Sequence, residues 1–202
     1  MFAGTDTTSL ALTWILYLLA YYPDIQDRLR TELLSVVPSA PVESLTADEI
    51  QSLYASIVEL QFLENVIRET LRLIPPVHSS IRMATKDDVV PVSSPLKRRT
   101  LDGRIQEEIV AQIFVPKGTF IHVPIEGFNL DKELWGSTAW NFKYVFARHF
   151  QCIMILTIFL RSPDRWTDLP ETVKELPGLY NHLLTFSAGP RVSYPFTLSP
   201  IG

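Results

Sequence analysis

Asp6 and Thr7 place a carboxylate next to a hydroxyl near the start of the chain, within the run AGTDTT at residues 3–8. An acid beside a hydroxyl suits a short proton relay. The small residues Ala3 and Gly4 would allow a flat ligand to approach a helix backbone closely. Aspartate and threonine are also common helix N-caps. Taken by themselves, these residues favour the N-cap interpretation over the relay.

Glu69 and Arg72 are three residues apart, a spacing that puts both side chains on one face of a helix. Such a pair is either an exposed ion pair worth under about 1 kcal/mol or a buried pair whose charges must be fully satisfied. Glu64 and Arg68, four residues apart in the same segment, have an equally favourable spacing. The spacing does not decide which pair is buried.

Two more groups lie towards the end of the chain. Residues 141–143 read NFK and residues 163–166 read PDRW, with a mostly apolar stretch between them. Residues 185–191 read TFSAGPR. A glycine next to an arginine in a loop suits an anionic group. Each group is a weak indication when taken alone.

Composition excludes several classes of protein. The chain has 202 residues, of which 47% are hydrophobic, and a formal net charge of −4. The hydrophobic content excludes an intrinsically disordered chain. The negative net charge excludes an overall positive charge that would attract nucleic acid. The single cysteine, Cys152, excludes an internal disulfide and any zinc or iron–sulfur site that needs paired cysteines. The uncharged run at residues 9–22 is shorter than the roughly 20 residues of a membrane span, so a buried helix is favoured.

The elements that must position these residues begin with helices. We expect a helix over residues 1–22, ended by Pro23, which suits the first turn of a second helix over about 24–37. The run TADE at 46–49 is a capping box that opens a short helix. Apolar residues at helical spacing predict a longer helix over 56–73.

Four short β-prone runs follow, at residues 79–83, 89–92, 108–114 and 119–124. The last two are predicted to be joined as a hairpin by the PKG at 116–118, where proline fixes φ and glycine accepts a positive φ. Residues 97–104 are expected to be a basic, solvated loop. Helices followed by a small β-region and loops indicate a mostly α (α+β) fold.

Taken in order, the motifs resemble those of the C-terminal part of a cytochrome P-450, a haem-thiolate monooxygenase, and their detail is similar to fungal members. AGTDTT resembles the oxygen-activating motif of the I helix, and ETLR at 69–72 resembles the E-x-x-R of the K helix. Residues 142–166 resemble an interrupted F-x-P-x-R. FSAGPR at 186–191 resembles the start of the haem loop F-x-x-G-x-R-x-C-x-G.

The resemblance implies a partial P-450 fold: one incomplete domain over residues 1–202. Residues 1–22 would be the second half of the I helix, and 56–73 the K helix. Residues 186–191 would begin the haem loop. The family's membrane anchor and the first half of the I helix are expected to be absent from this chain, together with packing partners of the first helix.

The resemblance also implies a cofactor, haem (heme, iron protoporphyrin IX), and roles for individual residues. Asp6 and Thr7 would deliver protons to dioxygen, with Ala3 and Gly4 packed over the haem. Glu69, Arg72 and Arg165 would form a buried structural triad. Residues 77–80 and 7–11 would line the substrate pocket. The remaining haem-binding residues implied are Arg82, Phe186, Gly189 and Arg191.

Three segments depart from the family pattern. Ser193 occupies the position of the cysteine that binds iron, and a serine hydroxyl is a poor iron ligand at neutral pH, so no metal ligand is assigned. Residues 144–162 interrupt F-x-P-x-R as an anomalous insert, and residues 192–202 form a tail that does not follow the family. Cys152 lies in the insert, in apolar surroundings typical of a buried cysteine rather than of a replacement thiolate.

Translated introns would explain both the insert and the tail, because residues 143–145 and 192–193 can be encoded by splice-donor sequences. An authentic insertion and a diverged pseudogene are the alternatives.

By resemblance, the expected function is a monooxygenase that places one atom of dioxygen into a small organic substrate. Its electrons would come from a NADPH-dependent reductase at the cytosolic face of the endoplasmic reticulum. Without the cysteine, this chain is expected to be inactive, and no nucleic acid partner is expected. The alternatives are a non-enzymatic truncated or mis-spliced product and a helical fragment that binds a partner. A small membrane-associated protein is the least favoured class.

Overall fold

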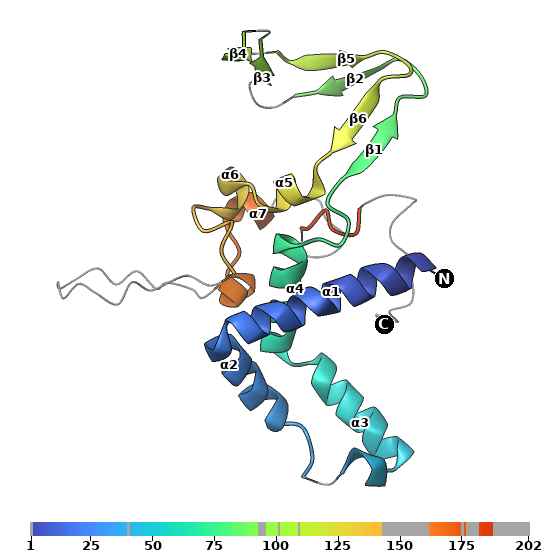
Figure 1. The fold of residues 1–202 in the computed structure, drawn as a ribbon, viewed down its shortest axis with the longest axis vertical. Helices are drawn as coiled ribbons and strands as arrows, with labels where there is room; N and C mark the ends of the chain where they lie inside the picture. The colour runs from blue at the N-terminus through green and yellow to red at the C-terminus, as the bar shows by residue number, and fades with distance from the viewer. Residues whose placement is uncertain are drawn as a thin grey trace, which may run out of the picture. The chain divides into compact units, whose positions relative to one another are not determined.

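The structure is a computed structural model, and it describes residues 2–39, 41–92, 96–100, 102–108, 110–142, 162–174, 176 and 182–187. Contacts divide the chain into two units. One comprises Met1–His78 with Ile125–Gly202 and is helical, and the other comprises Ser79–Pro124 and is made of strands (Figure 1). The mostly α (α+β) fold expected from the sequence is confirmed.

The chain begins with two consecutive helices, α1 (Phe2–Tyr21) and α2 (Pro23–Leu34). Pro23 occupies the first turn of α2, as the sequence predicts, since its missing N–H would have no helical acceptor there. The end of α2 was predicted at residue 37. The helix ends at Leu34 instead, and the N–H of Ser35 bonds back to the carbonyls of Glu32 and Leu33.

A short 3₁₀ helix, η1 (Val42–Ser44), precedes α3 (Ala47–Val58) and α4 (Gln61–Leu73). The predicted capping box at Thr46 and Glu49 is present. The predicted single helix over 56–73 is wrong at its start, because residues 56–58 end α3 and a new helix begins at Gln61.

Glu32 explains the break between α3 and α4. Its carboxylate accepts the backbone N–H groups of Phe62 and Leu63, each at 2.9 Å, and so satisfies two donors at the start of α4. The local N-cap residue, Leu60, has no side chain able to do this. A residue 30 positions earlier in the chain therefore caps α4.

α4 lies at the centre of the helical unit. It contacts α1, α2 and two elements from later in the chain, α5 (Ile125–Asn129) and the 3₁₀ helix η2 (Ser162–Thr167). Figure 1 shows α1 passing across α4. One apolar cluster joins α1, α2 and α4, and its buried members include Leu18, Ile25, Leu29, Phe62 and Val66.

A second apolar cluster also packs against α4. It combines Leu71 with residues of α6 (Lys132–Trp135), η2 and α7 (Glu171–Lys174). Its two largest members, Trp135 and Trp166, have ring centroids 5.6 Å apart. Segments distant in the sequence thus meet against α4.

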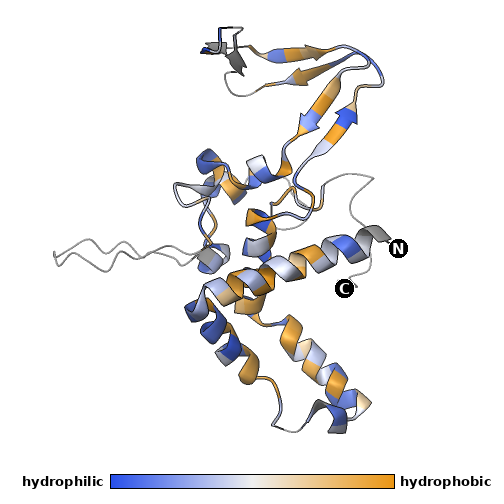
Figure 2. Ribbon diagram, viewed as in Figure 1, coloured by the Kyte–Doolittle hydropathy of each residue, from blue (hydrophilic) through white to orange (hydrophobic). Residues whose placement is uncertain are grey.

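Parts of α1 and α3 carry apolar side chains on their exposed surface. In α1, Leu12, Leu16 and Tyr21 are 54%, 58% and 66% exposed, and Figure 2 shows hydrophobic colour along much of this helix. α3 has no buried residue at all. Among the residues that the structure describes, no helix combines the length and apolar character needed to cross a membrane.

The strands of the second unit form nested antiparallel pairs. β1 (Ser80–Met83) pairs with β6 (Phe120–Val123), and β2 (Asp88–Pro91) pairs with β5 (Gln112–Val115). β3 (Leu96–Arg99) pairs with β4 (Ile105–Glu108) at the tip of the ribbon (Figure 1).

Two sequence predictions about this ribbon are wrong. The PKG at 116–118 does not join paired strands: the N–H of Gly118 donates to the carbonyl of Ala84, so the turn is a bend within one side of the ribbon. Residues 97–104 are not simply a loop, because they include most of β3 and the terminal turn. That turn is closed by the bond from the N–H of Gly103 to the carbonyl of Thr100.

Candidate functional site

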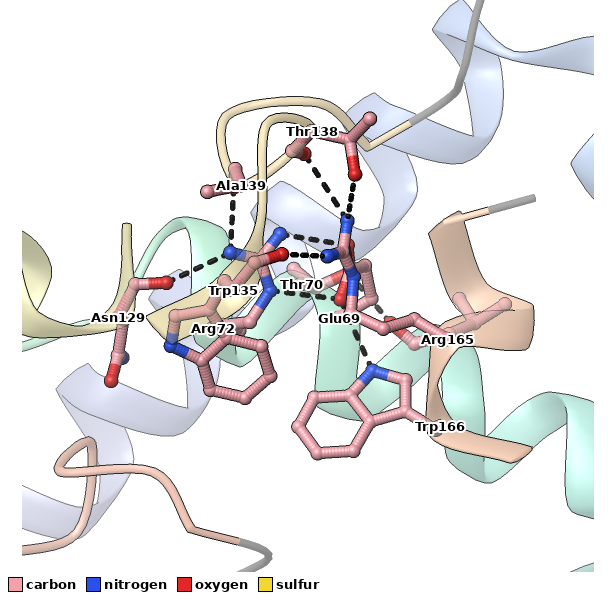
Figure 3. Close-up of polar contacts among 10 residues, drawn as sticks. Glu69, Thr70, Arg72, Asn129, Trp135, Thr138, Ala139, Arg165 and Trp166 are labelled. Carbon is pink, nitrogen blue, oxygen red and sulfur yellow. Dashed lines mark hydrogen bonds and ion pairs between the residues drawn. The ribbon is translucent and has the colours of Figure 1, made fainter. Parts of the chain in front are cut away.

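A fully buried ion pair lies on α4. The guanidinium of Arg72 donates from Nε to Oε2 of Glu69 at 2.9 Å and from Nη2 to Oε1 at 2.8 Å, and both side chains are 0% exposed (Figure 3). This forked geometry matches the two oxygens of a carboxylate. Glu64 and Arg68 also pair, but their side chains are 31% and 23% exposed. Burial therefore separates two pairs that spacing could not distinguish.

Arg165, from η2, adds a second cation. Its Nε lies 3.6 Å from Oε1 of Glu69, so the structure brings together the three residues of the triad suggested by resemblance. Burial lowers the pKa of the Arg165 guanidinium from its ordinary value, and the nearby charge of Glu69 opposes that effect. The site holds one carboxylate and two guanidinium groups.

The Nη groups that do not bind Glu69 donate to backbone carbonyls and to one hydroxyl. Arg72 Nη1 donates to the carbonyls of Asn129 at 2.8 Å and Ala139 at 2.6 Å. Arg165 Nη1 donates to the carbonyl of Trp135 at 2.7 Å, and its Nη2 donates to the carbonyl and hydroxyl of Thr138 at 3.1 Å each. The charged groups thus hold the segment that follows α5 against α4 and η2.

Trp166 completes the shell around Glu69. Its indole Nε1 donates to Oε2 at 3.1 Å, which adds a neutral donor without adding a third positive charge. The sequence motif PDRW contains this residue, but spacing alone gave no signal of its role. We call Glu69, Arg72, Arg165 and Trp166 the buried network.

A long-range ion pair holds η2 from the other side. The guanidinium of Arg28, on α2, donates to both oxygens of Asp164 at 2.8 Å. The same guanidinium lies 3.8 Å from the ring centroid of Phe62. η2 is therefore fixed to α2 as well as to α4.

A mainly apolar cavity of about 380 Å³ lies within the helical unit, next to α1 and α4. Among the described residues that line it, none has a charged side chain, and the polar side chains are those of three threonines. The volume falls in the range of small-molecule sites in proteins. Its lining residues are Thr7, Thr8, Ala11, Leu12, Ile15, Ile67, Leu71, Pro76, Val77, Thr185 and Phe186.

Several residues suggested by resemblance meet at this cavity. Thr7 and Phe186 line it, as does Val77 from the predicted pocket segment. The Thr7 hydroxyl donates to the carbonyl of Gly4 at 3.4 Å. A Cβ built at Gly4 would meet no atom within 4 Å, so the helix surface is open at this residue. Asp6 is exposed and does not line the cavity.

Other candidate residues lie elsewhere. Ala3 is in the first turn of α1. Arg82 is an exposed residue of β1, where it pairs with Ile121 and donates to the hydroxyl of Ser80 and, at 3.1 Å, to the carbonyl of Ile81. Outside the described residues lie Gly189, Arg191, Ser193, Cys152, residues 144–161 of the predicted insert, and the tail at 192–202.

The residues of the cavity suit the apolar ring of a haem but offer no ligand suited to its iron. Its apolar lining suits the face of a flat, apolar ring system. Its polar side chains are hydroxyls, which are poor iron ligands at neutral pH, and none is a thiolate. Among the described residues, no cluster of histidine, cysteine and carboxylate side chains forms a metal site either. The described lining therefore does not supply what a haem-thiolate centre requires.

Comparison with known proteins decides the family. The family model for cytochrome P-450 matches residues 1–145. The chain belongs to the cytochrome P-450 family. The match ends near the start of the predicted insert.

Curated P-450 relatives from fungi match the chain along almost its whole length. Cytochrome P-450 monooxygenase 128 of Postia placenta is 38% identical over 198 residues, which cover 97% of this chain and 30% of the relative. A ganoderic acid synthetase of Ganoderma lucidum is 37% identical over 202 residues, which cover 98% of this chain and 31% of that relative. The predicted family and its fungal character are confirmed, and the chain spans about 30% of the length of these P-450 relatives.

Proposed function

We propose that this chain is part of a haem-dependent P-450 monooxygenase that acts on a small organic substrate with electrons from a NADPH-dependent reductase. The site of action would be the cytosolic face of the endoplasmic reticulum. One observation carries the proposal: the apolar cavity is bordered by Thr7 and Phe186, from the first and last family motifs. The buried network, built from the two motifs between them, includes Glu69 and Arg72 of α4, the helix that also lends Ile67 and Leu71 to the cavity wall.

Within this proposal the chain's own residues have limited roles. The apolar lining would exclude water and hold a neutral substrate. The Thr7 hydroxyl would hold a proton at the cavity wall, and the exposed Asp6 carboxylate would exchange protons with solvent. The buried network would fix the core beneath the site without taking part in chemistry.

We further propose that the chain as given lacks haem-thiolate activity. Ser193 stands where the family has its cysteine, and the described part of the cavity lining has threonine hydroxyls as its polar side chains. Because the thiolate favours cleavage of the O–O bond, its loss would prevent activation of dioxygen even if haem entered the cavity.

Carbon monoxide binding tests both proposals. The purified chain is mixed with haemin, reduced and exposed to carbon monoxide, and its Soret band is recorded for the wild type and for Ser193→Cys. The wild type should show no thiolate-type band, and Ser193→Cys should gain one. Ser187→Cys, which adds a cysteine earlier in the same motif, is the matched control and should not gain it.

A thiolate-type band in the wild type would contradict the proposed loss of activity. Absence of the band in a folded Ser193→Cys variant would count against the haem site and favour the non-enzymatic alternative.

We also propose that residues 144–162 are a translated intron. The family-model match ends at residue 145, whereas the alignments with the fungal relatives run on past the insert, and both flanks of the insert are held by the core. Phe142 is buried, with its ring centroid 5.4 Å from that of Tyr22, and Asp164 is bound by Arg28. The insert starts between these anchors, although its last residue, Ser162, is also the first residue of η2.

Sequencing the transcript across both junctions tests the intron proposal directly. A mature message that keeps residues 144–162 would contradict it. In the protein, deletion of 144–162 should leave the free energy of unfolding unchanged or raise it. Deletion of residues 163–166, which removes Arg165 and Trp166, is the control and should destabilise the chain strongly.

A further inference from the structure

Asn129 is a buried residue for which neither the motifs nor the family resemblance gives a role. It ends α5 and is 0% exposed. Its backbone carbonyl accepts Nη1 of Arg72 at 2.8 Å, which joins it to the buried network. Its side-chain amide points away from the network, towards the segment at residues 182–187.

Both groups of the Asn129 amide bind that segment. Nδ2 donates to the hydroxyl of Thr185 at 2.9 Å, and Oδ1 accepts the backbone N–H of Leu184 at 3.4 Å. The Thr185 hydroxyl in turn donates to the carbonyl of Leu71 at 2.9 Å. A continuous chain of hydrogen bonds therefore runs from Arg72 through Asn129 to Thr185 and back to α4.

This chain of bonds ends at the wall of the cavity, since Leu71, Thr185 and Phe186 all line it. The segment at 182–187, which carries Thr185 and Phe186, has an unfavourable backbone at both ends: His182 and Ser187 have φ values of 65° and 60°, in the left-handed region that non-glycine residues seldom adopt. Such a conformation persists when surrounding contacts impose it. The Asn129 amide supplies two of these contacts.

We propose that Asn129 is a positioning residue that couples the buried network to the Thr185–Phe186 wall of the cavity. The network fixes the backbone of Asn129, and the amide then fixes where the wall lies. Asparagine suits this position because its side chain donates and accepts at once while fully buried. The proposal concerns the cavity wall itself and holds with or without a bound haem.

Hydrogen exchange of the full chain tests this coupling without any ligand. Asn129→Leu keeps the backbone carbonyl that Arg72 binds and removes both amide bonds. Exchange of the N–H groups of Leu184 and Ser187 should speed up about tenfold, as expected for the loss of two net hydrogen bonds. Exchange in the middle of α4 should not change.

Thr138→Val is the matched control. It removes a hydroxyl that Arg165 binds beside the same network but that makes no hydrogen bond with the described residues 182–187. It should leave exchange at Leu184 and Ser187 unchanged. Equal acceleration at α4 and at the wall in Asn129→Leu would indicate a purely global role and would overturn the proposal.

Thr185→Val keeps the test decisive if Asn129→Leu does not fold. It keeps the side-chain shape and removes one hydroxyl with both of its hydrogen bonds, to Asn129 and to Leu71, so it should speed exchange at Ser187 about tenfold. In the double variant, Asn129→Leu should add less than it does alone, because Thr185 is one of its two partners. Unchanged exchange in Thr185→Val would also overturn the coupling.

Discussion

The indole Nε1 of Trp166 donates to Oε2 of Glu69 at 3.1 Å, whereas the Nε1 of the neighbouring Trp135 has no hydrogen-bond partner among the described residues. Both rings are buried in one apolar cluster. Two similar tryptophans therefore differ in one contact: Trp166 binds a buried charge, and Trp135 packs by its rings and lies 5.0 Å from the Arg72 guanidinium.

This difference predicts unequal effects of tryptophan-to-phenylalanine changes. Trp166→Phe should lower the free energy of unfolding by about 1.5–3 kcal/mol, because a hydrogen bond to a charged group is lost. Trp135→Phe loses no such bond and should cost less. Urea unfolding followed by circular dichroism measures both. Equal losses would mean that packing alone explains the role of Trp166.

Burial predicts that the two ion pairs of α4 contribute very differently. Arg72→Met leaves the carboxylate of Glu69 without its forked partner and should cost about 3–5 kcal/mol. Arg68→Met removes a partly exposed partner of Glu64 and should cost about 0–1 kcal/mol. Thermal unfolding of the two variants compares them. A mild effect of Arg72→Met would contradict the network described here.

The cap at the start of α4 predicts a remote effect of α2 on that helix. Glu32→Ala should cost about 0.5–2 kcal/mol, the usual loss for a helix cap, because two N–H groups lose their acceptor. Exchange of the N–H groups of Phe62 and Leu63 should become faster. Glu43→Ala, at an exposed residue of η1, serves as control. Unchanged exchange at Phe62 in Glu32→Ala would show that the cap contributes nothing.

The capping box of α3 predicts a pH-dependent helix start. The pKa of Glu49 lies below its ordinary value, chiefly because the backbone N–H of Thr46 donates to its carboxylate, with a further bond from the Thr46 hydroxyl. A carboxyl group whose pKa is lower in the folded state than in the unfolded chain stabilises the folded state. This contribution is fully present at pH values above the pKa of the group in the unfolded chain. That contribution disappears as the pH falls through the folded value.

We therefore expect the first turn of α3 to loosen on acidification through the lowered pKa of Glu49. Carbon chemical shifts of the Glu49 carboxyl give that pKa, and backbone shifts of residues 47–50 report the helix. Thr46→Val should raise the pKa only in part, since the backbone bond remains. Glu49→Gln should abolish the pH dependence, and persistence of the same titration in that variant would assign it to another group.

Local patterns predicted much of the fold. The apolar run, the capping box and the position of Pro23 predicted the bounds of α1 and the starts of α2 and α3 to within about a residue of those in the structure. The break at Glu59 and Leu60 was missed because the α4 cap comes from Glu32, which no local pattern can reveal. The strand pairing was missed for a similar reason: PKG has the residues of a hairpin turn, yet the pairing of β5 with β2 makes it a bend.

The sequence likewise predicted some residues of the site but not the contacts between residues that lie far apart in the chain. The family resemblance suggested that Glu69, Arg72 and Arg165 form a triad, and the structure places them together. Spacing could not show that Glu69 and Arg72 are buried while Glu64 and Arg68 are partly exposed, because burial depends on what packs over α4. The roles of Trp166 and Asn129 depend on contacts across 97 and about 56 residues, which a single sequence does not display.

The nested pairing of the ribbon gives it an unusual freedom of length. The backbone leaves the helical unit at His78 and returns at Ile125, and the N–H of Glu126 donates to the carbonyl of His78 at 3.0 Å. Every strand of the ribbon pairs with a strand on its other side, so the separation of those two ends does not depend on how many pairs lie beyond them. We therefore expect changes of length at the β3–β4 turn to leave the bond between Glu126 and His78 in place.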